Sequence, residues 1–587
     1  MPLLIMENFD LRLSLLNTIE NQSGLPNLYR ISLILVLFIF VVLALSPTIF
    51  NESKVSRFIL RVFSEPVFLA WTGLAILAGR WPVLLAPSIN SDENQFIAAA
   101  MTLVKEPAFW RSVDTGTSGP LNIIPLTIPK LLNIRIDYAS ARVIGLFLVI
   151  LSVIFFYYSL KYLYDNRVAR IATIPVVLFF SLAVHSNFVH YSSEHFPIAI
   201  LSTALWITCY VYTRKFSDRM VFIFGAVIGM MPYAKMQGLP VALAITLIFA
   251  HILWTRKESL RQFLKSLATL ALGLLLFSAI NLFFLILFST SEDFWRRYIL
   301  QNLLIYADLK NRTFGEKFSQ FISMASREGL NSSSLFQITS IFLIPATILF
   351  FRESIVRRKL FFTNTFIFFF YSLFILVVSI YVIVRPGNHF LHYLLFLVFP
   401  CGFLIGVIIG EIFKLSENNA FYKQIQFLIL LLMIAVILPQ SYTFIRSKNP
   451  YLSRHQKYLQ DYQTPVVQTI LQYALPTDSM AVWGKRNDLY VETGLYPGVR
   501  DGLIIWMAFK GPQQAYHLKS FADDLLKSKS KVFVDATAGD KSYVDKTICR
   551  RKNTNCRYDA YPEIATVIEN NYRMVDEVEG IRIYVRK

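Results

Sequence analysis

The sequence predicts an α-helical polytopic membrane protein with a C-terminal soluble α/β domain. Hydrophobic residues make up 55% of the 587 residues, and charged residues only 16%. The apolar residues gather in runs long enough to cross a hydrocarbon core of roughly 30 Å, instead of being spread along a water-soluble chain. After residue 445 the charge rises and the apolar runs shorten to strand length, which indicates a separate soluble domain.

About twelve transmembrane helices are expected, and they form a membrane module over residues 31-445. In chain order they lie near residues 31-50, 67-87, 140-160, 171-188, 197-213, 220-234, 238-254, 266-289, 336-351, 360-384, 393-413 and 425-445. The pair at 220-254 is the least regular, because it is interrupted by Pro232, Lys235, Gln237 and Pro240. We therefore expect two short spans there.

Basic residues cluster on every second loop, and this pattern sets the expected orientation. The clusters are Lys54/Arg57/Arg61, Lys161/Arg167/Arg170, Arg214/Lys215/Arg219, Arg256/Lys257/Arg261/Lys265 and Arg352/Arg357/Arg358/Lys359. Because cytoplasmic loops carry the excess of Lys and Arg, residues 1-30 and 446-587 are expected outside, on the periplasmic side of a bacterial inner membrane. The same clusters account for the net charge of +19, so no nucleic-acid partner is expected.

Two outside loops, 88-139 and 290-335, are long enough to carry function, whereas the cytoplasmic loops are short basic connectors. The first loop contains the acidic pair Asp92-Glu93 and a helical stretch at 95-103. The second opens with Phe294-Trp295-Arg296-Arg297-Tyr298, a mixture of aromatic and basic residues that suits a helix lying among lipid headgroups. We expect this second loop to cover a lipid.

The C-terminal segment 446-587 is expected to fold as a compact accessory domain with its own core. Strands are predicted at 479-483, 531-535 and 581-585, and helices at 513-527 and 561-570. Cys549 and Cys556 lie in this domain, and an oxidising compartment permits a disulfide between them. Their spacing leaves open whether it forms.

Asp92 and Glu93 are the first candidates for chemistry. A carboxylate at the water interface above a helical bundle can accept a proton from a hydroxyl, or hold a divalent cation such as Mg or Mn with its neighbour. The alternative is structural, since Asp92 precedes a helical run and suits an N-cap. Adjacent residues on a helix point in different directions, so we expect one acid to be chemical and the other supporting. No cofactor is required by the sequence.

Cationic and polar side chains elsewhere on the outer face suit an anionic ligand. The Lys235 ammonium lies between two short apolar runs and needs a phosphate or carboxylate partner, unless it extends to the outer interface. The loop 385-393 offers Arg385, His389 and His392, which suit phosphate binding but are equally compatible with a solvated loop. Further pocket candidates are Glu194, His195, Gln95 and Tyr393. None of them forms a strong metal motif.

In residue order the chain resembles the GT-C superfamily of integral-membrane glycosyltransferases, near the protein O-mannosyltransferase and aminoarabinose-transferase branch. The residues that carry the resemblance are Asp92-Glu93, Ala98-Ala99-Ala100, Gly119-Pro120-Leu121, Gly229 before Lys235, His392-Tyr393-Leu394-Leu395 and Val482-Trp483-Gly484. A second long outside loop also falls six spans after the acidic one. The resemblance covers nearly the whole chain.

The resemblance implies transfer of a hexosyl or pentosyl group from a polyprenyl-phosphate donor to an extracytoplasmic lipid, glycan or protein, with inversion at the anomeric carbon. It implies Asp92 as general base. Cations must then stabilise the departing phosphate, and Lys235, Arg385, His389 and His392 are the expected ligands.

The chain departs from the aminoarabinose-transferase pattern at two places. Gln95 stands where that enzyme has Arg, and Ser118-Gly119-Pro120 replaces its Lys-Pro-Pro element. The departures weaken the case for lipid A as acceptor. Two other functions stay open: an O-antigen ligase or polymerase with a diphosphate-linked donor, and a lipid or solute transporter. A transporter is disfavoured because the two halves show no internal repeat and the polar residues gather on one face.

A reporter that is active only in the cytoplasm, fused after Lys587, is expected to be inactive, because the distribution of basic residues places the C-terminal domain outside. A fusion within the basic loop at Lys257 is the matched control and is expected to be active. Activity of the Lys587 fusion would overturn the topology.

Overall fold

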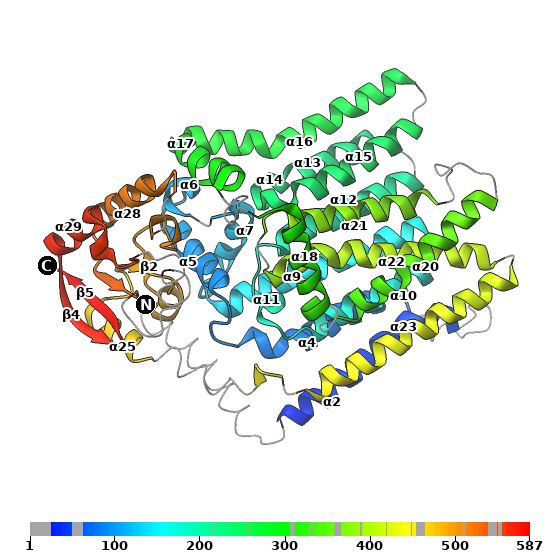
Figure 1. The fold of residues 1–587 in the computed structure, drawn as a ribbon, viewed down its shortest axis with the longest axis horizontal. Helices are drawn as coiled ribbons and strands as arrows, with labels where there is room; N and C mark the ends of the chain where they lie inside the picture. Colours follow the sequence, from blue (N-terminus) through cyan, green and yellow to red (C-terminus); the bar gives the residue numbers. More distant parts are fainter. Residues whose placement is uncertain are drawn as a thin grey trace.

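The computed structural model describes residues 25–49, 63–114, 116–214, 217–256, 259–305, 312–329, 333–356, 366–387, 390–417, 419–447, 449–452, 464–508, 511–537, 549 and 555–587. Long helices lie side by side in a bundle, and the C-terminal domain lies beyond one end of it (Figure 1). We call this end of the bundle the domain end. Short helices from several loops lie between the two parts (Figure 1).

All twelve predicted spans are helical in the structure. They are α2 (Leu25–Ile49), α4 (Glu65–Leu84), α9 (Tyr138–Leu163), α10 (Asn166–Leu182), α12 (His195–Thr213), α13 (Asp218–Gly229), α15 (Leu239–Arg256), α16 (Leu260–Phe288), α20 (Ser334–Val356), α21 (Ile367–Val384), α22 (Leu395–Ser416) and α23 (Ala420–Arg446). Within the described ranges, ten helices are long and apolar enough to cross a membrane. The expected fold class is confirmed, and the two predicted spans outside these ten are α10 and α13, which have 17 and 12 residues.

The short helix α13 shows how the sequence breaks the regular bundle. It ends at Gly229, and the chain continues through α14 (Met231–Ala234) and the 3-10 turn η3 (Met236–Gly238) before α15 begins. Pro232 lies in the first turn of α14, where its missing N–H costs nothing. Lys235 falls between α14 and η3 in extended conformation, so the break places this ammonium at the domain end.

Close helix contacts at glycine hold the peripheral helices. Gly225 and Gly229 on α13 meet the backbone of α16, and a Cβ at either position would collide with a carbonyl of Leu270 or Leu274. Small residues four apart allow this approach between membrane helices. Helix α22 is buried from Leu395 to Phe413, whereas α16 and α23 are mostly exposed, as expected for lipid-facing helices.

Short elements cover the domain end. They are α5 (Ser91–Lys105), α6 (Phe109–Ser112), α7 (Pro120–Ile123), η2 (Ile124–Thr127), α8 (Ile128–Leu131), α11 (Ser186–Val189), α17 (Ser291–Asp293), η4 (Phe294–Ile305), α18 (Phe314–Met324), η6 (Ala325–Gly329) and η7 (Leu391–Leu394). Helix α5 carries the acidic pair and lies against the C-terminal domain (Figure 1).

The C-terminal domain contains a five-stranded sheet in the order β2-β1-β3-β5-β4. Its strands are β1 (Ser479–Trp483), β2 (Tyr496–Pro497), β3 (Val532–Asp535), β4 (Tyr572–Val578) and β5 (Ile581–Arg586), and its helices are α25 (Pro465–Tyr473), α26 (Asp488–Thr493), α27 (Ile505–Ala508), α28 (Gln514–Ser528), η10 (Tyr558–Ala560) and α29 (Pro562–Asn571). Strand β1 runs parallel to β2 and β3, and β5 is antiparallel to β3 and β4. The three predicted strands and both predicted helices are confirmed. Cys549 is bonded to Cys556.

Candidate functional site

Glu93 is fully buried and paired with Arg142 of α9. Arg142 Nε donates to Oε1 at 2.9 Å and Nη2 to Oε2 at 2.5 Å, and the Tyr191 backbone N–H also donates to Oε1 at 2.7 Å. The two carboxylate oxygens are thus used in a bidentate ion pair within the protein. Glu93 supports the loops, and it is not placed to share a cation with Asp92.

Asp92 lies in the first turn of α5 and is half-buried. The cap of this helix is Asn90, whose side chain accepts from the Asp92 N–H at 2.8 Å, so the structural alternative, in which Asp92 caps the helix, is wrong. Asn90 fits better because it lies one residue before the helix and is extended. No ion pair to Asp92 is present in the described part of the chain. Its carboxylate therefore differs from that of Glu93 in carrying no neutralising cation.

Lys235 and Glu194 form a second buried ion pair. Lys235 is 2% exposed, and its Nζ donates to Glu194 Oε1 and, at 2.8 Å, to Ser193 Oγ. Ser192 and Ser193 donate to the other carboxylate oxygen. The ammonium therefore does not extend to the interface, which excludes the snorkelling alternative. Lysine has three N–H groups, and two are directed at Glu194 and Ser193.

The electrostatics of Glu194 follow from this enclosure. Burial alone would raise the pKa of the Glu194 carboxyl, but the charge of Lys235, that of His392 and the hydrogen bonds lower the pKa to about 2. The Glu194 carboxyl is consequently ionised at neutral pH.

His392 and Tyr393, at the start of η7, complete a polar cluster with Lys235 and Glu194. His392 Nε2 is 4.0 Å from Glu194 Oε1, and the Lys235 ammonium is 5.0 Å from the centre of the Tyr393 ring. Asp92 is also close enough to act electrostatically on the His392 ring. His392 Nδ1 is buried and has no hydrogen-bond partner. The sequence candidates Asp92, Glu194, Lys235, His392 and Tyr393 are thus brought together.

His195 lies behind this cluster, on the side of α4 and α9. Its Nδ1 accepts from the Ser192 N–H at 3.3 Å, and its Nε2 is buried without a partner. It lines a cavity of about 20 Å³ together with Arg80 and Arg142, which is room for one water molecule. His195 is therefore a supporting residue of the loop that carries Glu194.

Arg385 and His389 stay predictions as phosphate ligands. Arg385 is exposed at the end of α21, and its carbonyl accepts from Lys317 Nζ at 3.3 Å. His389 lies outside the described residues.

Gln95 and the second loop belong to a different cluster, between the bundle and the C-terminal domain. Gln95 Nε2 donates to the Asp114 carbonyl at 3.0 Å. Arg297 donates to Asp114 Oδ2 at 2.9 Å and to Asp501 at 3.0 and 3.3 Å, and it is 3% exposed. The stretch 294–298 is expected to suit the lipid headgroup region, but its Arg297 side chain is buried, because two acids from opposite sides of the interface bind it.

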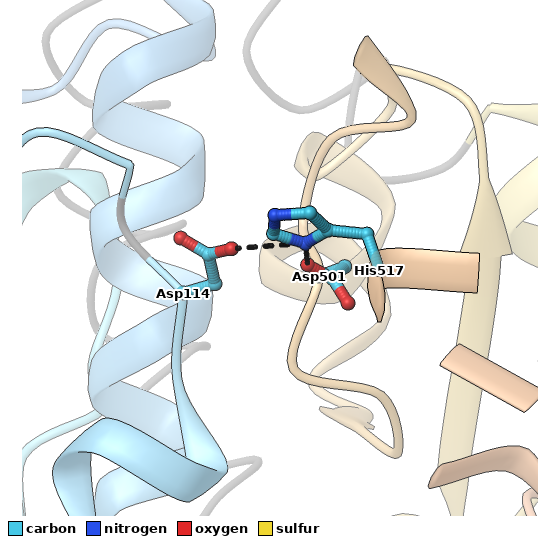
Figure 2. Close-up of side chains that lie close together, drawn as sticks. All are labelled: Asp114, Asp501 and His517. Atoms are coloured by element: carbon cyan, nitrogen blue, oxygen red, sulfur yellow. Dashed lines mark hydrogen bonds and ion pairs between the residues drawn. The ribbon is translucent and has the colours of Figure 1, made fainter. Parts of the chain in front are cut away.

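Asp114, Asp501 and His517 come close enough to suggest a metal site, and they are the single such group in the described ranges (Figure 2). His517 Nδ1 is 3.0 Å from Asp501 and 3.8 Å from Asp114. The Arg297 guanidinium already binds the same carboxylate oxygens, and its positive charge opposes a metal ion there. The donor set does not fit a cation, and we interpret it as an ion-pair cluster.

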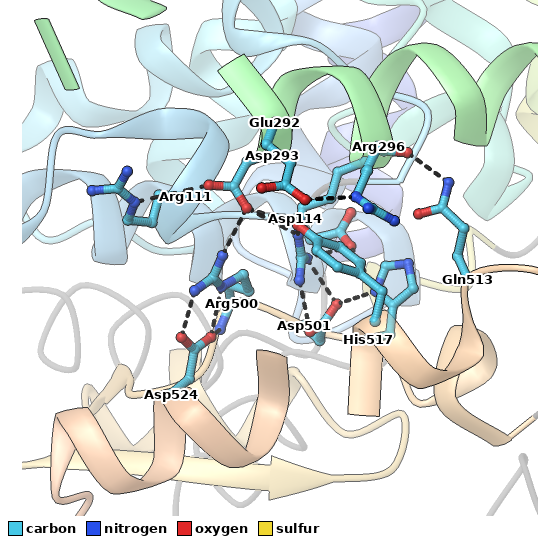
Figure 3. Close-up of polar contacts among 12 residues, drawn as sticks. Arg111, Asp114, Glu292, Asp293, Arg296, Arg500, Asp501, Gln513, His517 and Asp524 are labelled. Carbon is cyan, nitrogen blue, oxygen red and sulfur yellow. Dashed lines mark hydrogen bonds and ion pairs between the residues drawn. The ribbon is translucent and has the colours of Figure 1, made fainter. Parts of the chain in front are cut away.

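The cluster extends over the whole interface (Figure 3). Arg500 pairs with Asp524 at 2.8 Å within the C-terminal domain and with Asp293 of α17 at 3.1 Å. Arg111 of α6 also approaches Asp293, at 3.8 Å. The pKa values of the two buried acids are shifted in opposite directions. Burial raises the pKa of Asp114, whereas Arg297 and His517 hold the pKa of Asp501 below its usual value despite burial.

Glu194→Gln is expected to destabilise the fold by about 3–5 kcal/mol, because it leaves the buried Lys235 charge without its partner. Since the folded pKa of Glu194 is lowered, its contribution is fully present above the unfolded value of 4.5 and is lost as the pH falls toward about 2. Equilibrium unfolding in mixed detergent–SDS micelles measures the difference from wild type, which should be constant above about pH 5 and shrink below it.

Glu292→Gln is the matched control, because Glu292 pairs with Arg296 at the surface, and no measurable change is expected. A Glu194→Gln protein as stable as the control variant would contradict this assignment.

Comparisons with known proteins support the fold. No protein-family model and no curated protein matches the sequence. ArnT from Cupriavidus metallidurans bound to undecaprenyl phosphate is similar in structure, with a TM-score of 0.54 and 11% identity over 88% of this chain and 97% of that chain. The apo state of the same ArnT has a TM-score of 0.50 and 12% identity, again over 88% of this chain and 97% of that chain. The Archaeoglobus fulgidus oligosaccharyltransferase tethered with an acceptor peptide has a TM-score of 0.42 and 12% identity, over 86% of this chain and 72% of that chain. The chain therefore has the GT-C fold of ArnT, as the resemblance of its motifs predicts.

Proposed function

We propose that the protein is a glycosyltransferase that moves a sugar from a polyprenyl-phosphate donor to an acceptor hydroxyl, with Asp92 as general base. The observation that carries the proposal is the pairing of charges at the domain end. Glu93 and Glu194 are each neutralised by a buried cation, whereas the half-buried Asp92 has none in the described residues. The neighbour ArnT was solved bound to undecaprenyl phosphate, which supports the donor class.

Apolar side chains lie below the polar cluster, around a cavity of about 20 Å³ that has room for one water molecule. Its lining includes Leu201 and Leu205 of α12, Val241 and Ile245 of α15, and Phe396 and Phe399 of α22. These three helices begin next to Glu194, Lys235 and His392, so the pocket lies roughly one to three helical turns below those polar groups. A polyprenyl chain does not fit a cavity of this size, so the proposal rests on the charged groups.

The reaction follows from the positions of the charged groups. The Asp92 carboxylate accepts the proton of the acceptor hydroxyl, whose oxygen forms a bond to the anomeric carbon. The bond from that carbon to the phosphate oxygen breaks, and polyprenyl phosphate leaves with the electron pair. Attack from the side opposite the phosphate inverts the anomeric configuration.

Lys235 is the proposed ligand of the departing phosphate. Its third N–H group and the unpartnered Nδ1 of His392 are the donors that this role uses. Glu194 holds the Lys235 ammonium in place, and its negative charge offsets that of the ammonium. The ion pair therefore attracts the phosphate less strongly than a lone ammonium would, so the product phosphate can leave. Arg385 is a proposed second ligand at the surface. The acceptor is a lipid, glycan or protein on the side of the C-terminal domain, which we propose is the periplasm.

Asp92→Asn is expected to lower sugar transfer by about 10²–10⁴-fold, because the amide cannot accept the acceptor proton. Transfer is measured in proteoliposomes with polyprenyl-monophosphate-linked and diphosphate-linked sugars, and only the first is expected to serve as donor. The thermal transition is expected to stay at the wild-type temperature.

Asp218→Asn is the matched control, since Asp218 pairs with Lys265 at the surface of α13. Full transfer by Asp92→Asn would remove Asp92 as the base, and a preference for the diphosphate-linked donor would favour the ligase or polymerase class.

A further inference from the structure

The second loop is tied to both sides of the proposed reaction centre through two consecutive residues. Arg297 binds the first loop and the C-terminal domain, and Tyr298 binds the segment before Lys235. Both residues are nearly inaccessible, at 3% and 1% exposed. Side chains this enclosed have no alternative partners in water, so they fix the spacing of the elements that they join.

The connection to the base runs through Asp114. Arg297 donates to the Asp114 carboxylate, and the Asp114 carbonyl accepts from Gln95, three residues along α5 from Asp92. A backbone hydrogen bond also joins the first loop to the C-terminal domain, since the Asp114 N–H donates to the Arg500 carbonyl at 3.2 Å. The Glu93–Arg142 pair fixes the start of α5, and this contact with the C-terminal domain further constrains the orientation of the helix that carries Asp92.

The connection to the phosphate ligand runs through Pro232. Tyr298 Oη donates to the Pro232 carbonyl at 2.6 Å, three residues before Lys235. Gly119 N–H donates to the Ala234 carbonyl at 2.9 Å, and a Cβ at Gly119 would collide with the Tyr233 carbonyl. This close packing holds the Lys235 segment against the first loop.

The C-terminal domain contributes two ion pairs to the second loop. Asp501 binds the Arg297 guanidinium through both oxygens, and His517 is 3.0 Å from the same acid (Figure 2). Arg500 bridges to Asp293, just before η4 (Figure 3). The C-terminal domain is thus bound to the second loop at two nearby residues, Asp293 and Arg297.

We infer that Arg297 is a positioning residue, through which the C-terminal domain sets the distance between the Asp92 helix and the Lys235 segment. The inference rests on the proposed function for its kinetic part. It gives the C-terminal domain a role beyond an accessory one: the domain holds the base and the phosphate ligand at the spacing that in-line transfer requires.

Arg297→Met tests the inference with two independent readouts on the full-length protein. Spin labels at Val104 of α5 and Leu239 of α15, both exposed, report the spacing of the two elements. We expect the distance distribution to broaden. In the transfer assay we expect kcat to fall about tenfold or more with little change in the KM for the donor, because the donor site itself is intact.

Gln95→Met is the second variant, since it cuts only the link from α5 to Asp114 and leaves no buried charge unpaired. It is expected to fold like wild type and to shift both readouts in the same direction. Arg296→Met is the matched control, because its side chain is the exposed neighbour of Arg297 and pairs with Glu292. The control is expected to behave as wild type.

Two outcomes overturn the positioning role: a Gln95→Met protein with wild-type kcat and a narrow distance distribution, or an equal broadening in Arg296→Met. Absence of transfer by the wild type with any lipid-linked sugar counts against the proposed function alone, since the distance measurement does not depend on activity.

Discussion

The Glu93–Arg142 ion pair is the contact on which the geometry of the domain end depends. Arg142 also donates to the carbonyls of Val83 and Pro87, and Glu93 accepts from the backbone of Tyr191. One buried pair thus joins α4, α5, α9 and the loop before α12. Because two desolvated charges satisfy each other there, neither is available for chemistry, and the adjacent Asp92 is presented on a helix whose start is fixed.

Three carboxylates at this end of the bundle therefore have three different environments. Glu93 is neutralised by a guanidinium, Glu194 by an ammonium that hydroxyl groups also support, and Asp92 by neither in the described residues. Such a division separates the supporting acids from one that can accept a proton. The pair of Glu194 with Lys235 also keeps a cation within a low-dielectric site, where an unpaired ammonium would be costly.

The helices and the main strands could be predicted from apolar periodicity, but β4 (Tyr572–Val578) could not, because it is a polar strand at the sheet edge. The site was predicted in part. Isolated charges in apolar surroundings identified Lys235, whereas its partner Glu194 lies in another loop and only the fold joins them. Arg142 was missed, although a guanidinium inside a predicted span is a signal of a buried ion pair. The burial of Arg297 could not be predicted, because its partners Asp114 and Asp501 are distant from it in the sequence.

A structure of the protein with a bound polyprenyl monophosphate tests the central claim most directly. The account predicts that the phosphate contacts Lys235 Nζ and the His392 ring, and that Asp92 faces the position of the anomeric carbon. A phosphate bound away from Lys235, with the Lys235–Glu194 pair unchanged and Asp92 turned from the headgroup, would contradict it.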